Sequence, residues 1–359
     1  MPKENKQVEP IKEYYIAYFD LLGYKDFFEK SPEKASDFLN TIYEAIENTK
    51  AYILGLHSSP IVGEFGEIYI RVKVFSDNVL LCLERGSTPK ECLRFLSFMA
   101  ITADIQRNFI LKHDLFLRGG ITIGTLSFNN DFIFGQGLID AVALEESAIY
   151  PRIIIGQAVI DYAQQTHFVK QEEFRKFFEI QNHINANEHI SDDDIAFSNA
   201  IMPYIIQEKL YFQLQDLLIF KAFDGTALLN YLYCIDINTI LGPIFTQQIL
   251  EFVKTISPDD YQKLGNLSPN QKQRLKEHKE HIIQKIKKYG KYDDLDISDD
   301  KGATIREHIL KKYLWTLSFH NCICQIYHFK ECMIQSGSTC DIRFMRMTAE
   351  IFENTPVET

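Results

Sequence analysis

The chain has 359 residues, 46% of them hydrophobic, with 27 Phe and 18 Tyr, so it can bury a sizeable core and is not a disordered polymer. Its formal net charge of −11 argues against a nucleic-acid coat, because neutralising a phosphate backbone needs an excess of Lys and Arg. No signal-like or membrane-spanning run is present, and seven Cys form no regular framework, so we expect a reduced, cytoplasmic protein.

The segment YYIAYFDLLGYKDFF at residues 14–28 predicts a buried strand that ends on a carboxylate. Strand-forming residues lead into Asp20, and Gly23 interrupts the run before a helix begins. An acid at the tip of a buried strand is costly unless a metal ion or a basic partner meets it. The alternative is an ordinary helix N-cap or turn, so the interpretation depends on a second carboxylate.

Predicted helices and strands alternate through the middle of the chain. Apolar residues at helical spacing predict helices over 31–57 and 88–112, with a hairpin at 63–83 between them. LFLRGGITIGTLSF and DFIFGQGLI predict two further strands around an Asn-Asn-Asp turn. A short helix over 138–148, a strand at PRIIIG and a strand pair around Asp224-Gly225 follow.

This order of elements is typical of an α+β fold with a ferredoxin-like antiparallel sheet and covering helices. From about residue 240 the chain turns to charged helices, such as LSPNQKQRLKEHKEHIIQKIKKYG, which is expected to end at Gly290. We therefore divide the chain into a core at 14–236 and a mainly helical extension at 237–359. The extension is expected to pack on the core or on a second subunit.

Two C-terminal segments offer metal-binding alternatives. The acidic loop YDDLDISDDKG has the wrong ligand spacing for calcium and favours a solvated loop. The other segment has helical spacing and lacks paired CxxC knuckles, which favours buried thiols over zinc. Its His and Cys residues are His320, Cys322, Cys324, His328 and Cys332.

The second carboxylate is Asp77, at the tip of the predicted hairpin IYIRVKVFSDNVLLCL. Strand alternation places it on one face with Tyr69, Arg71 and Lys73. If this hairpin neighbours the first strand, Asp20 and Asp77 meet at one edge of the sheet. Two such acids repel unless metal neutralises them, and oxygen-ligated divalent ions can activate a hydroxyl and hold a triphosphate.

These motifs resemble those of class III nucleotidyl cyclases. YFDLLGYKDF is similar to their strand-turn, and RVKVFSDN to their Lys-x-x-Gly-Asp hairpin, with Ser76 in place of Gly. LFLRGGITIG, FGQGLIDAVALEE and YPRIII follow in the family order, and the set is most similar to the pyrimidine cyclases of bacterial Pycsar anti-phage defence. The resemblance covers about residues 14–156 and extends at most to 236.

The resemblance implies that Asp20, Asp77 and the carbonyl of Leu21 hold two divalent metal ions, Mn²⁺ or Mg²⁺. It also implies that backbone N–H groups of the Gly23-Tyr24 turn bind phosphate oxygens, since this turn opens a helix. The expected reaction is attack of the ribose 3′-hydroxyl of CTP or UTP on the α-phosphorus, with release of pyrophosphate.

Lys73 stands where purine cyclases carry their base-reading Lys. Together with Tyr69 and Arg71 it is expected to form a base pocket, and a solvated strand face is the alternative.

One departure from the family concerns the Asn and Arg that stabilise charge on the phosphate, whose positions are Ile139 and Ala143 here. Arg118 is the expected replacement, because a fixed cation suits the phosphorane, and a structural salt bridge is the alternative. We interpret Glu145 and Arg152 as polar residues that support the core.

Class III sites form between subunits, so the resemblance implies a homodimer with two equivalent sites. It further implies a cyclic nucleotide product sensed by a separate effector protein, and neither a nucleic-acid nor a membrane partner. A purine cyclase and a catalytically silent nucleotide-binding module remain alternatives. A palm-domain polymerase is disfavoured by the acidic balance and the lack of a basic template path.

Overall fold

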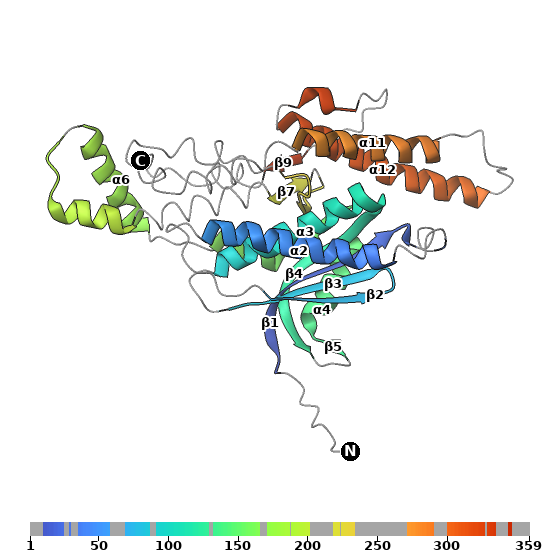
Figure 1. Cartoon of the computed structure of the whole chain (residues 1–359), viewed down its shortest axis with the longest axis horizontal. Helices are drawn as coiled ribbons and strands as arrows, with labels where there is room; N and C mark the ends of the chain where they lie inside the picture. Colours follow the sequence, from blue (N-terminus) through green and yellow to red (C-terminus); the bar gives the residue numbers. More distant parts are fainter. Residues whose placement is uncertain are drawn as a thin grey trace, which may run out of the picture.

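The computed structural model describes residues 10–24, 29, 35–57, 69–86, 91–128, 132–165, 171–186, 188–201, 218–222, 224–233, 271–290, 300–326, 329–334 and 344–346. They form an α+β fold in which helices pack on a nine-stranded mixed sheet (Figure 1). The expected fold class is confirmed.

The first four strands make the antiparallel centre of the sheet. They are β1 (Lys12–Leu22), β2 (Ile70–Phe75), β3 (Asn78–Glu84) and β4 (Phe116–Phe128). Their spatial order is β2-β3-β1-β4, and every neighbouring pair is antiparallel. With a helical crossover after β1 and another after β3, this is the expected ferredoxin-like arrangement. The first strand runs through Asp20 to Leu22, so Asp20 lies within the strand and not just after it.

Shorter strands extend the sheet beyond β4. The first, β6 (Ile153–Ile155), pairs parallel with β4, so the sheet as a whole is mixed. The expected late hairpin follows as β8 (Ala227–Leu229) and β7 (Ile219–Ala222), and the last strand is β9 (Phe344–Arg346). Because β9 pairs with β7, the C-terminal part of the chain contributes a strand to the same sheet. A two-residue strand, β5 (Ile133–Phe134), pairs with β4 only.

Helices cover the two faces of the sheet unequally. The long helices α2 (Ala35–His57) and α3 (Glu91–His113) cover one face, where Tyr15, Ala17 and Phe19 join the main hydrophobic core. The shorter α4 (Gln136–Ser147) covers the other face over a smaller cluster that includes Tyr14, Ile16 and Leu80. Strand alternation accounts for this division along β1. Asp20 has the parity of Tyr14 and Ile16 and so lies on the α4 face.

Three further described helices were not foreseen from the sequence: α5 (Gln157–Gln165), α6 (Gln171–Asn185) and a helix over 192–201. The charged helix predicted after residue 240 is α11 (Gln271–Gly290), and it ends at Gly290 as expected. Gly63, Gly66 and most of the acidic loop lie outside the described residues. Among the described helices, none combines the length and apolarity needed to cross a bilayer.

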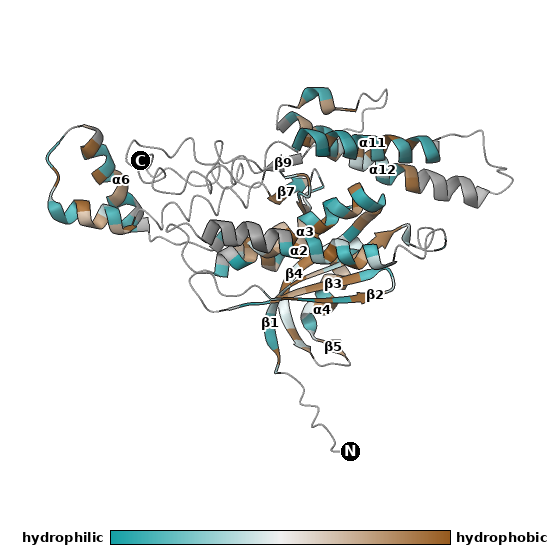
Figure 2. Ribbon diagram, viewed as in Figure 1, coloured by the Kyte–Doolittle hydropathy of each residue, from teal (hydrophilic) through white to brown (hydrophobic). Residues whose placement is uncertain are grey.

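The C-terminal helices α11 and α12 (Asp300–Ile326) lie side by side against the β7–β9 end of the molecule (Figure 1). Figure 2 colours much of the described ribbon of α11 and α12 as hydrophilic, whereas the central strands mix hydrophobic and hydrophilic residues. Their inner side is tied to the core through Asp114, at the turn before β4. Lys285 and His281 of α11 reach this carboxylate over 2.6 and 3.1 Å.

The His/Cys segment lies at the α11–α12 contact, where Cys324 and Cys332 are buried free thiols. His320 is also buried and contacts His278 and the carbonyl oxygen of Cys332, both over 3.0 Å. In the part of the chain that the structure describes, no three His, Cys, Asp or Glu side chains are placed to hold a metal ion. His328 lies outside that part.

Candidate active site

The structure brings the ends of β1 and of the β2–β3 hairpin together at one edge of the sheet. Asp20 pairs with Asn78 in the β1–β3 ladder, and Asp77 is the turn residue directly before Asn78. The backbone N–H of Leu21 donates to the carbonyl oxygen of Asp77 over 2.9 Å. The preceding turn residue, Ser76, has φ of 60°, a left-handed conformation that non-glycine residues seldom adopt. The two acids thus meet as predicted.

Arg118 lies directly across the β1–β4 ladder from Asp20. Its Nη2 is 3.3 Å from Asp20 Oδ2 and 2.6 Å from Glu145 Oε1 of α4. The Glu145 side chain is only 7% exposed, whereas that of Arg118 is 27% exposed. The same guanidinium nitrogen therefore contacts both acids, with the shorter distance to Glu145, which is the more buried of the two.

The electrostatics of this cluster favour an additional cation. Burial raises the pKa of Asp20, Arg118 opposes that rise, and the neighbouring Asp77 adds to it. Burial likewise raises the pKa of Glu145, which Arg118 again opposes and Asp20 increases. Asp20 and Glu145 thus share the Arg118 guanidinium, and Asp77 adds a further negative charge beside Asp20. A cation bound beside Asp20 and Asp77 would relieve their repulsion.

Two side chains at this edge were not predicted from the sequence. Tyr18 lies two residues before Asp20 on the same face of β1, and burial together with Glu145, Asp20 and Asp77 raises the pKa of its hydroxyl. Strand parity could have identified it. Lys312 of α12 interacts electrostatically with both Asp20 and Arg118, and burial lowers its pKa. No local pattern marks this residue, because its position depends on how α12 packs.

The proposed base-reading residues lie on the same face of the sheet as Asp20. Lys73 pairs with Leu80 and Arg71 with Cys82, and both partners belong to the cluster under α4. The Arg71 guanidinium stacks over the ring of Phe128 at 4.7 Å, so that side chain also has a packing role. Tyr69, just before β2, is 71% exposed.

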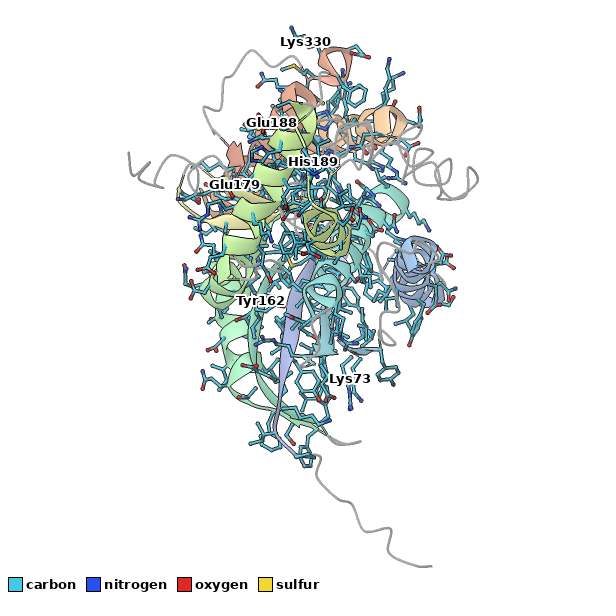
Figure 3. The ribbon with its side chains drawn as sticks, turned by 90° about the vertical axis from the view of Figure 1, so that its left-hand side faces the viewer. Lys73, Tyr162, Glu179, Glu188, His189 and Lys330 are labelled. Atoms are coloured by element: carbon cyan, nitrogen blue, oxygen red, sulfur yellow. The ribbon has the colours of Figure 1, made fainter. Side chains whose placement is uncertain are left out.

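Figure 3 shows Lys73 in the lower part of the view, well away from the labelled residues of α6 and the turn after it. Lys73 and Arg71 are both half-buried, so the face is neither sealed nor fully solvated.

The turn after β1 is tight, and the side chain of Tyr24 packs into the core. Gly23 has φ of 87°, a conformation that suits glycine, so the tight turn is present as expected. The ring of Tyr24, however, packs edge-on against Phe38 of α2 with centroids 6.2 Å apart. Only the backbone of Tyr24 is left for the proposed phosphate contact. Leu21 is buried, and its side chain belongs to the main core.

Close packing of α4 on β4 sets the position of Glu145. A Cβ at Gly120 would lie 2.2 Å from Leu144 Cβ, and one at Gly124 would lie 2.5 Å from Gly137 Cα. The glycines of RGGITIG therefore allow the helix to lie directly on the strand. This brings Glu145 within reach of Arg118, one residue before the two successive glycines of β4. Ile139 and Ala143 lie on the exposed side of α4.

Arg152 supports the core, as expected, through Asp224 at 2.8 Å and the ring of Trp315. Glu145 has a more direct relation to the site, since it holds Arg118.

The donor set fits hard divalent cations. Asp20 and Asp77 supply carboxylate oxygens beside a main-chain turn, and Mg²⁺ is commonly held by one or two carboxylates plus substrate phosphates and water. Such a site needs no third protein carboxylate, which agrees with the lack of a three-residue cluster among the described side chains.

Comparison with solved structures gives partial likenesses, among them two to proteins from Pseudomonas aeruginosa. No family model and no curated protein matches the chain. The adenylyl cyclase CyaB from Pseudomonas aeruginosa aligns at 17% identity and a TM-score of 0.32, covering 44% of this chain and 83% of its own. A class III adenylyl cyclase-like ATP-binding protein from the same organism aligns at 13% identity and a TM-score of 0.27, covering 45% of this chain and 37% of its own.

Proposed function

We propose that the protein is a nucleotidyl cyclase that converts CTP or UTP into the 3′,5′-cyclic monophosphate and pyrophosphate. The observation that carries the proposal is the meeting of Asp20 and Asp77 at one sheet edge, with Arg118 opposite. Two carboxylates beside a fixed guanidinium suit phosphoryl transfer, which needs bound cations and charge stabilisation and no protein nucleophile.

In this reaction the ribose 3′-oxygen attacks the α-phosphorus. A 3′-O–P bond forms, the bond from the α-phosphorus to the bridging oxygen breaks, and that oxygen leaves with its electron pair as pyrophosphate. The proton of the 3′-hydroxyl passes to water. Divalent ions bound by Asp20 and Asp77 would supply a lowered hydroxyl pKa and charge neutralisation of the triphosphate.

The protein's own groups orient the substrate around that site. Arg118 is anchored by Glu145, which leaves its open side for an α-phosphate oxygen once Asp20 is engaged elsewhere. The turn at Gly23 presents backbone N–H groups to phosphate, and Lys73 with Arg71 and Tyr69 contacts the base. These roles, and the homodimer that would complete each site, are part of the proposal.

The pyrimidine substrate and a role in anti-phage signalling, with a separate effector that senses the product, are supported by the resemblance of the sequence motifs. A purine cyclase is a second candidate, because Lys73 occupies the base-reading position of that branch. A silent nucleotide-binding module is a third, because Ile139 and Ala143 replace the family Asn and Arg.

The test is to incubate the purified protein separately with ATP, GTP, CTP and UTP in the presence of Mn²⁺ and to identify products by mass spectrometry. We expect one 3′,5′-cyclic pyrimidine product that disappears in Asp77→Ala. Asp161→Asn, on the exposed side of α5, is the matched control and should keep full activity. A cyclic purine product would select the second candidate, and nucleotide binding without turnover would select the third.

A further inference from the structure

The C-terminal helix α12 crosses the core at the stretch of β4 that carries Arg118. The ring of Tyr313 packs edge-on against Phe116, the first residue of β4, with centroids 5.2 Å apart. Trp315 stacks on Tyr150 at 5.5 Å. On the far side of Arg118, the N–H of Gly119 donates over 3.0 Å to the segment that follows Tyr150, at the carbonyl of residue 152. Thus α12 contacts β4 directly at Phe116 and, through Trp315, contacts the segment that bonds Gly119.

Lys312 lies on the inner face of α12. It is followed at helical spacing by the buried residues Trp315, Thr316 and Phe319, which face the core. Lys312 itself is half-buried, whereas the preceding Lys311 is exposed. A lysine at a core-facing position needs an anionic partner to offset its desolvation, and surface solubility does not explain it.

The net charge around Lys312 favours a bound anion once the neighbouring acids hold a divalent cation. Lys312 attracts Asp20 and is repelled by Arg118, so two cations face the same carboxylate. With Asp77 and Glu145 included, the five groups sum to −1, from two positive and three negative charges. Each divalent cation held by the acids adds two positive charges, which turns the edge from slightly anionic to strongly attractive for a polyphosphate.

We propose that Lys312 binds the β- and γ-phosphates of the nucleoside triphosphate, so that α12 is part of the active site. The inference rests on the proposed function for its substrate. A lysine ammonium is a mobile point charge suited to phosphate oxygens. Lys312 precedes Tyr313, which packs on Phe116, two residues before Arg118. It gives the C-terminal extension a direct role in substrate binding.

The test measures binding of inorganic tripolyphosphate by isothermal titration calorimetry at fixed free Mn²⁺. We compare the wild type with Lys312→Ala, Lys312→Arg and the matched control Lys311→Ala. Removing one charge-assisted contact should weaken binding about tenfold in Lys312→Ala, while Lys312→Arg largely restores it and Lys311→Ala is unchanged. Lys312→Met keeps the aliphatic stem and replaces Lys312→Ala if that variant loses its native circular dichroism.

Steady-state kinetics separate this inference from the proposed function. Where the wild type forms a cyclic product, Lys312→Ala should raise KM about tenfold with a smaller change in kcat, because ground-state phosphate binding is lost. Equal tripolyphosphate affinity in wild type and Lys312→Ala, or a higher turnover in the variant, would overturn the role of Lys312. A wild type that binds tripolyphosphate through Lys312 and cyclises no nucleotide would overturn the proposed function alone. Failure of the wild type to bind tripolyphosphate would overturn the Lys312 inference.

Discussion

The N–H of Leu21 donates to the carbonyl oxygen of Asp77 over 2.9 Å. This main-chain hydrogen bond fixes how the end of β1, which carries Asp20, meets the turn that carries Asp77. The backbone pairing of β1 with β3 holds Asp20 and Asp77 close together, although their carboxylates repel each other. The repulsion between Asp20 and Asp77 therefore destabilises the folded state, and a bound metal cation would reduce it. This electrostatic conflict is the basis for the first prediction.

Metal binding should stabilise the wild type and fail to stabilise Asp77→Asn. The substitution keeps the side-chain shape while removing one of two carboxylate ligands. At a Mn²⁺ concentration about a hundred times Kd, the stability gain in the wild type is about 2.7 kcal/mol, visible as a rise in Tm. The same titration on Asp161→Asn controls for weak surface sites. An equal rise in Tm for Asp77→Asn would exclude Asp77 as a metal ligand.

The ion pair between Arg118 and Glu145 should be strongly coupled. Replacing Arg118 by Gln leaves the buried Glu145 carboxylate without its cation, which should cost about 2–3 kcal/mol of unfolding free energy. Replacing Glu145 by Gln as well should recover part of that loss. Urea unfolding of both single variants and the double variant measures the coupling, expected at about 1–2 kcal/mol. Strictly additive effects would show that the pair is not a unit.

Activity separates the two residues of this pair. Arg118→Gln should lower kcat at least about a hundredfold if the guanidinium stabilises charge on the phosphate. Glu145→Gln should lower kcat less than Arg118→Gln does. The double variant should have a kcat as low as that of Arg118→Gln alone. Equal kcat values in the two single variants would indicate that Arg118 only supports the fold.

The buried histidine pair predicts that stability falls in mild acid. His320 Nε2–H donates to the Cys332 carbonyl, so its Nδ1 accepts from His278 Nδ1–H, whose Nε2 accepts from the Tyr231 hydroxyl. A second proton on His320 would lie on Nδ1, against the N–H of His278, and a second proton on His278 would lie on Nε2, where the Tyr231 hydroxyl now donates. Burial lowers the pKa of His320 to about 4 and that of His278 well below its ordinary value.

The sign follows from proton uptake. Between pH 6.5 and about 4 the unfolded chain binds a proton at His320 that the folded chain does not. Stability is therefore complete above the unfolded pKa and decreases as pH falls, by about 3 kcal/mol for His320. Asp20 and Glu145, whose pKa values are raised, act in the opposite direction. Urea unfolding at several pH values should show a shallower acid loss in His320→Gln and no change in slope in the exposed His189→Gln.

Local strand patterns predicted the acidic edge on one condition, that the hairpin neighbours the first strand, and the β1–β3 ladder meets that condition. The parity of Asp20 on β1 and the hairpin tip at Asp77 are local properties, and the α+β order of elements followed from the same patterns. Lys312 could not be placed this way, because its position depends on tertiary packing of Tyr313 on Phe116. The parallel β4–β6 pair and the addition of β9 likewise depend on long-range topology that no local period encodes.

The Tyr24 ring shows a different limit. Its position after Gly23 suggested a phosphate-binding turn, which concerns the backbone alone. An aromatic side chain beside an apolar helix gains more by burial, and the ring packs on Phe38. Sequence patterns predict where the backbone makes a turn. They do not predict where a large aromatic side chain at that turn packs, because this depends on the neighbouring hydrophobic core.

The last prediction concerns base selection by Lys73. This half-buried residue lies on the Asp20 face, and its neighbour Arg71 is stacked on Phe128, so of the two cations Lys73 is the better placed to reach a base. Lys73→Ala should lower kcat/KM for the preferred nucleotide about tenfold and reduce its preference over the other three. Measuring kcat/KM for ATP, GTP, CTP and UTP tests this, with Lys12→Ala at the opposite end of β1 as control. A uniform loss for all four nucleotides would mean that Lys73 contacts phosphate or ribose and that another residue reads the base.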